Sequence, residues 1–183
     1  MRYLSIVLFA LVFVSSPVNA SEPLTPRPLD PIASETFDRA RSQSAVVRSL
    51  ITTLESSNVI VHIISSRGMP MGVGGTTQFV TSRGGYRYVR ITLAVELTTS
   101  GRAAILAHEL QHACEVATSD ANDLESVKDL FEKEGHRAGD YYETRAALTT
   151  ERLVKDELNA ANAALRAHAG RRLQSEPVVK FDH

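Results

Sequence analysis

Apolar positions recur with a helical spacing near the start of the chain and then change to the spacing of strands. Within residues 34–57, apolar side chains such as Leu50 and Leu54 fall at steps of three and four residues, which predicts an amphipathic helix with Ser34 as its N-cap. The next stretch, VIVHIIS at 59–65, is β-branched and almost continuously apolar. It therefore predicts a buried strand.

Two further runs have the composition of a β-hairpin. TTQFVTS at 76–82 and YRYVRITLAVE at 86–96 are separated by Arg-Gly-Gly, and the second run alternates apolar and polar positions. The glycine-rich stretch before them, 67–75, carries no lysine and leads into no helix, so a flexible hairpin loop is favoured over a phosphate-binding loop.

Beyond the strands the spacing becomes helical again and stays so. It predicts helices at about 100–118, 123–135 and 140–168, with Asp123 and Asp140 as N-caps of the last two. The order of a helix, then strands, then helices is typical of an α+β domain. We therefore predict an α+β fold in which a small antiparallel sheet packs on helices, including a long C-terminal helix.

The first residues, 1–20, have the features of a secretory signal peptide. Arg2 precedes a short apolar run, and Val18-Asn19-Ala20 offers a cleavage site after Ala20. No later stretch has the roughly 20 apolar residues of a spanning helix. The expectation is an exported protein, periplasmic or secreted, whose mature chain does not insert into a membrane.

The composition of the remaining chain indicates how it is divided into segments and which classes of partner it does not favour. Residues 21–33 are rich in proline and are predicted to form a linker, 34–169 form one domain, and 170–183 form a flexible tail. Once the predicted signal peptide with its Arg2 is removed, the chain has 19 basic and 21 acidic residues. This nearly balanced charge gives no electrostatic reason to expect nucleic acid as a partner. The single cysteine, Cys114, excludes an internal disulfide and is read as a small apolar residue on a helix flank.

The candidate chemistry lies in LAHELQHA at 106–113, which contains the pattern H-E-x-x-H. With about 100° of rotation per residue, the leucine and alanine positions form one apolar stripe. His108 and His112 lie one turn apart on nearly the opposite side, with Glu109 beside them. Two imidazoles so placed can bind one Zn²⁺, and Glu109 is close enough to act on a water at the metal.

A catalytic zinc site needs a third protein ligand. We favour Glu143, on the expectation that it lies on a helix and shares a face with Ala146, Ala147 and Thr150, whose small size would allow close approach to the first helix. His136 is the main rival. The complete set of candidates is Glu125, Glu132, Glu134, His136, Asp140 and Glu143.

HELQHA, followed about thirty residues later by ETRAA, resembles the gluzincin branch of the zincin metallopeptidases. The metzincin pattern is absent, because Glu115 and Thr118 stand where it requires glycine and histidine. The resemblance implies a zincin-like domain with Zn²⁺ as cofactor, His108, His112 and Glu143 as metal ligands, and a peptide or protein substrate. It also implies that the strand near 87–95 runs beside the substrate cleft.

In such a site, Glu109 would take a proton from the zinc-activated water and deliver it to the leaving amine. The group that stabilises the oxyanion stays open among His136, Tyr141, Tyr142 and Arg145. Two other classes of function also stay open. One is a non-catalytic zinc-binding protein on a zincin-like scaffold, and the other is an exported chaperone or adaptor without metal.

Overall fold

The computed structural model describes residues 26–139 and 141–175, which form an α+β fold with five helices and two sheets. In chain order the elements are β1 (Arg27–Pro28), α1 (Pro31–Gln43), α2 (Ala45–Glu55), β2 (Val59–Ser66), β3 (Gly75–Arg83), β4 (Tyr86–Ala94), α3 (Thr99–Thr118), α4 (Leu124–Glu134), β5 (His136–Ala138), β6 (Tyr141–Glu143) and α5 (Arg145–Ser175). The predicted fold class is thus confirmed at the level of α+β. The expected signal peptide, 1–20, lies outside the described residues.

The main sheet has the strand order β1-β2-β4-β3 and is mixed, so the prediction of an antiparallel sheet is wrong. β3 and β4 form the predicted antiparallel hairpin, whereas β2 pairs with β4 in parallel. Val89, Ile91 and Leu93 of β4 have no exposed surface, whereas Phe79 is the one buried residue of β3. Because β4 has more to bury, it takes the inner position, and the glycine-rich loop leads from β2 to the far edge rather than closing a hairpin.

The single helix predicted for 34–57 is two helices, α1 and α2, which meet at Ser44. Ser44 has an extended backbone (φ −123°, ψ 124°), and its hydroxyl accepts a hydrogen bond from the backbone N–H of Val47 at 3.0 Å. The N-cap of α1 is Asp30 rather than Ser34, since the Asp30 carboxylate accepts from the N–H of Ala33 at 2.9 Å. Serine favours caps over helix interiors, which explains the break.

The linker predicted at 21–33 is too long at its C-terminal end. Pro31 starts α1, where its missing N–H is no loss and its φ suits a helix. Arg27–Pro28 forms β1, which pairs in parallel with β2. Asp30 connects α1 to β2, because its carboxylate caps α1 and also accepts from the backbone N–H of Ser65 in β2 at 2.6 Å.

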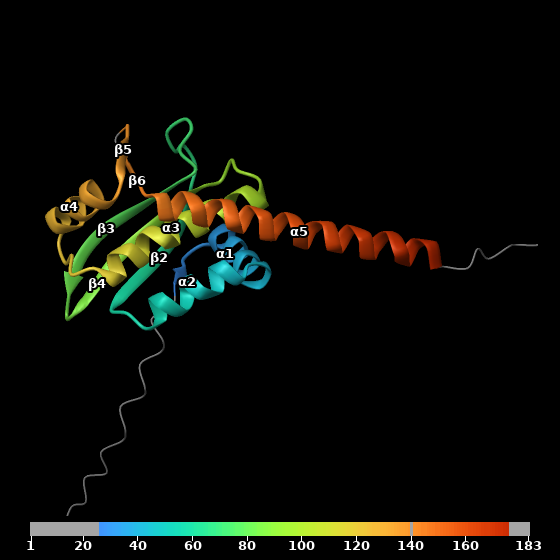
Figure 1. Cartoon of the computed structure of the whole chain (residues 1–183), viewed down its shortest axis with the longest axis horizontal. Helices are drawn as coiled ribbons and strands as arrows, with labels where there is room; N and C mark the ends of the chain where they lie inside the picture. Colours follow the sequence, from blue (N-terminus) through green and yellow to red (C-terminus); the bar gives the residue numbers. More distant parts are fainter. Residues whose placement is uncertain (1–25, 140, 176–183) are drawn as a thin grey trace, which may run out of the picture.

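Helix α3 lies at the centre of the fold, between the main sheet and helices α1, α2 and α5 (Figure 1). Its apolar stripe, including Leu106 and Leu110, has no exposed surface. Cys114 is buried as expected, and burial raises the pKa of its thiol to about 12. α5 lies along α3 and then extends past the rest of the described chain (Figure 1). No helix in the described ranges is long and apolar enough to cross a membrane.

The third predicted helix starts later and ends later than expected. The segments His136–Ala138 and Tyr141–Glu143 pair as the hairpin β5–β6, where the start of a helix was predicted. Gly139 between them has a φ of +66°, which suits a turn. Asp140, the expected cap, lies outside the described residues. Thr144 takes that place, since its hydroxyl accepts from the N–H of Ala147 at 3.1 Å. The helical backbone then continues to Ser175, into the expected tail. The second helix, α4, is confirmed with Asp123 as its cap.

Arg87 on β4 ties the C-terminal end of α3 to the sheet. Its guanidinium is buried and donates hydrogen bonds both to carbonyl oxygens at that helix end and to the side-chain oxygen of Asn58. The two hydrogen bonds to Asn58 measure 2.7 Å and 2.9 Å. Carbonyl groups at a helix end have no partner within the helix and carry the negative end of the helix dipole. The carbonyl oxygens that accept from Arg87 are those of Val116 (2.7 Å), Ala117 (3.0 Å), Ser119 (2.8 Å) and Ala121 (3.1 Å).

We predict that Arg87→Ala lowers the free energy of unfolding by about 2–4 kcal/mol, because buried carbonyl groups lose a charged donor. Urea denaturation followed by circular dichroism measures the change. The matched control is Arg90→Ala on the same strand, where an exposed arginine bonds to Gln78 and to no other side chain in the described ranges. That variant should stay within about 0.5 kcal/mol of the unsubstituted protein. Equal losses in both variants would contradict the assignment.

Candidate metal centre

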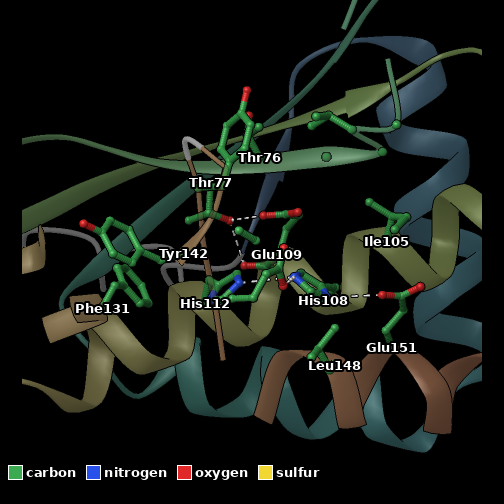
Figure 2. A pocket seen from close by; sticks show the side chains of 17 residues that line it. Thr76, Thr77, Ile105, His108, Glu109, His112, Phe131, Tyr142, Leu148 and Glu151 are labelled. Atoms are coloured by element: carbon green, nitrogen blue, oxygen red, sulfur yellow. Dashed lines mark hydrogen bonds and ion pairs between the residues drawn. The ribbon is translucent and has the colours of Figure 1, made fainter. Parts of the chain in front are cut away.

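His108 and His112 lie one turn apart on the side of α3 away from its apolar stripe, as predicted. Each is only 5% exposed, and their Nε2 atoms are 3.2 Å apart (Figure 2). The ring of His112 also packs edge-on against Phe131 of α4, with 5.3 Å between ring centroids. The two imidazoles are therefore held by packing in the interior and directed at one point.

Glu143 supplies a third group to this point. Its Oε2 atom is 3.0 Å from Nε2 of His108, and the candidate ligand atoms of His108, His112 and Glu143 all lie within 4.8 Å of one another. The fold thus brings the predicted residue to the two histidines. The prediction that Glu143 lies on a helix, however, is wrong. Glu143 lies on strand β6, before Thr144 caps α5, so the small residues of that helix do not share a face with it.

None of the rival ligands within the described residues joins this group. Glu132 accepts a hydrogen bond from the Tyr142 hydroxyl at 2.6 Å. His136 is exposed on β5. Glu125 and Glu134 are exposed residues of α4, also outside the group, and Asp140 lies outside the described residues.

Carboxylates lie beside the other ring nitrogen of each histidine. His112 donates from Nδ1 to Oε2 of Glu115 at 2.8 Å. His108 Nδ1 lies 3.3 Å from Oε2 of Glu151, but off the direction of a hydrogen bond, so it is held less firmly. The contact to Glu115 favours the proton on Nδ1 of His112, which leaves its Nε2 as a lone pair. Nε2 of His108 faces both this lone pair and the Glu143 carboxylate.

These three groups together favour a positive charge between them. Oε2 of Glu143 is buried and has no hydrogen-bond partner among the described residues. Burial by itself lowers the pKa of His108, but the carboxylates of Glu143, Glu109 and Glu151 raise it above its usual value. A proton on His108 or a divalent cation can supply the charge. Two imidazole nitrogens and one carboxylate oxygen are a donor set that Zn²⁺ accepts, so the residues present fit that metal.

Glu109 lies beside the cluster without belonging to it. It is 5% exposed, and its Oε2 accepts from the Thr77 hydroxyl at 2.7 Å (Figure 2). Burial raises the pKa of Glu109, while the Thr77 hydrogen bond and the two histidines oppose that rise. A side chain at Gly75 would place its Cβ 2.9 Å from Oε1 of Glu109 and 2.7 Å from Cγ2 of Ile105. Glycine there lets β3 approach α3 closely.

The cluster opens into a cleft with a volume of about 560 Å³. One wall is β3 and the loop before it, so the expectation that the strand near 87–95 borders the cleft is wrong; that strand is inside the sheet. Of the proposed oxyanion donors, Tyr141 and Tyr142 line the cleft, whereas His136 and Arg145 do not. The Tyr142 hydroxyl is engaged by Glu132.

Several residues of the site were not found from the sequence. Glu115 had a readable signal, because it lies three residues after His112 on the same helix and can reach its ring. Thr77, Thr144, Glu151 and Gly75 carried no such signal. They come from β3, from α5 or from the residue that caps α5, and the folded chain alone brings them to α3.

The described residues thus form an α+β domain with a buried His-His-Glu cluster beside a cleft. Comparisons of the chain with protein-family models, with curated proteins and with solved structures find no match. We therefore infer its function from the site's own residues.

We predict that the protein binds one Zn²⁺ and that His112→Ala and Glu143→Ala each abolish tight binding. Isothermal titration calorimetry measures the affinity and stoichiometry. His136→Ala, which removes an imidazole outside the cluster, is the matched control and should bind zinc normally. Zinc at a free concentration 100-fold above its Kd should raise the free energy of unfolding by about 2.7 kcal/mol. Loss of zinc in the His136 variant, with retention in the Glu143 variant, would reverse the ligand assignment.

Proposed function

We propose that the protein is a zinc-dependent metallopeptidase with a zincin-like fold. The observation that carries the proposal is the place of Glu109, whose carboxylate borders the cleft beside the His-His-Glu cluster without being one of its ligand groups. A purely structural zinc site has no use for such a group and usually closes its fourth position with a side chain. The resemblance of HELQHA and ETRAA to gluzincins supports the same conclusion.

In the proposed site, His108, His112 and Glu143 hold the zinc ion. When bound, zinc supplies Lewis-acid polarisation of a water and of the scissile carbonyl. Glu109 accepts the proton of the attacking water and later gives it to the leaving amine. Its Oε2 is held by Thr77, which leaves Oε1 for the proton. The burial that raises the pKa of Glu109 suits a group that must both accept and return a proton.

The proposed substrate is an extended peptide or protein segment. β3 is an edge strand of the main sheet and also a wall of the cleft. An exposed strand edge offers unpaired backbone groups to a peptide. Ile105 and Leu148 add apolar surface to the cleft. Together with the features of a signal peptide in 1–20, this supports a peptidase that acts outside the cytoplasm.

The alternative, a zinc-binding protein without catalysis, differs from this proposal in one residue. We predict that Glu109→Gln keeps the zinc stoichiometry of the unsubstituted protein and lowers peptide cleavage by about 10²–10⁴-fold, the usual contribution of a general base. Cleavage of a mixed peptide library, read by mass spectrometry, measures the loss.

The matched control for this test is Glu125→Gln, which changes an exposed glutamate of α4. It should cleave at the unsubstituted rate. Zinc binding without any cleavage by the unsubstituted protein would favour the non-catalytic alternative. Equal cleavage by the Glu109 variant would show that another group moves the proton.

A further inference from the structure

One carboxylate connects two of the proposed zinc ligands through the protein interior. Glu115 of α3 accepts from His112 Nδ1 on its Oε2 atom at 2.8 Å and from the Thr144 hydroxyl on its Oε1 atom at 2.6 Å. Its side chain is 10% exposed. Thr144 directly follows Glu143. A single side chain thus joins the helix that carries both histidines to the segment that carries the third ligand.

The directions of these hydrogen bonds follow from the groups involved. The Thr144 hydroxyl accepts from the backbone N–H of Ala147, at the start of α5, and therefore has its proton free to donate to Glu115. An ionised carboxylate only accepts, so His112 must donate from Nδ1. That tautomer leaves Nε2 of His112 as the lone pair directed at the cluster.

We propose that Glu115 is a positioning residue which, with Thr144, holds His112 and Glu143 in the geometry of one metal site. This inference rests on the proposed zinc site. Glu115 sets the tautomer and orientation of His112, and its hydrogen bond to Thr144 fixes the residue next to Glu143. Partners of this kind, one step behind the ligands, typically change metal affinity by 10- to 100-fold when mutated.

The other histidine gives an internal comparison. His108 faces Glu151 at a longer distance and off line, and Glu151 is also paired with Lys155. Glu151 therefore has a weaker hold on its histidine than Glu115 has. Glu151→Gln should reduce zinc affinity less than Glu115→Gln does.

The test measures zinc affinity by competition with a chelator, and the visible spectrum of the Co²⁺-loaded protein, in four variants. Glu115→Gln should lower affinity by about 10- to 100-fold and change the Co²⁺ spectrum. Thr144→Val should weaken binding in the same direction, and Thr144→Ser, which keeps the hydroxyl, should restore it. Thr150→Val is the matched control, because Thr150 of α5 is likewise a buried threonine bonded to α3, here to Gln111, and it has no hydrogen bond to a proposed ligand among the described residues.

A double variant separates positioning from general loosening of the helix contact. If Glu115 and Thr144 act through one hydrogen bond, the combined effect of Glu115→Gln and Thr144→Val on zinc affinity should be smaller than the product of the single effects. Unfolding of the metal-free variants in urea should show that each is folded.

Three results would overturn the inference. They are unchanged zinc affinity and Co²⁺ spectrum in Glu115→Gln, equal weakening by Thr144→Val and Thr150→Val, and absence of zinc binding in the unsubstituted protein. The last result also removes the proposed function. Zinc binding with the expected variant effects but without peptide cleavage would remove the peptidase proposal alone and leave the positioning role standing.

Discussion

Burial of polar side chains on a central helix is the constraint on which the rest of this structure depends. α3 is covered by the sheet on one side and by other helices on the other. Even so, it carries His108, Glu109 and His112 at 5% exposure each. An unpaired buried polar group costs free energy comparable to a lost hydrogen bond, and a buried charge costs more. The neighbouring elements therefore have to supply partners, and most of the site consists of those partners.

The partners come from α3 itself and from two other parts of the chain. Thr77 of β3 holds Glu109, Glu115 of α3 holds His112, and Glu143 of β6 faces both histidines. Gly75 allows β3 to come close enough for the first of these contacts. The site is consequently complete only when β3 and β6 both lie against α3. The site therefore forms only in the folded chain, and its three candidate ligand groups are a donor set that suits a cation.

Features with a short repeat along the chain were predicted well. The helical spacing around HELQHA placed both histidines correctly relative to the apolar stripe, and the β3–β4 hairpin and the cap at Asp123 were also correct. The predicted helix boundaries were wrong where a single capping residue ends or starts a helix within a continuous apolar pattern. Ser44 divides the first predicted helix, and Pro31 extends α1 into the expected linker. Such capping residues act locally, whereas the helical spacing of apolar residues continues across them. The spacing alone therefore does not show where one helix ends and the next begins.

By itself, the sequence determined which residues could form an H-E-x-x-H helix, because an α-helix repeats every 3.6 residues and two histidines four apart must share a face. It also determined the α+β composition. Only the tertiary structure decided that β2 pairs in parallel with β4, that β3 takes the edge beside the cleft, and that Glu143 reaches His108 from a strand rather than a helix. These outcomes depend on which strands bury the most apolar surface and on contacts between residues tens of positions apart, which no local period records.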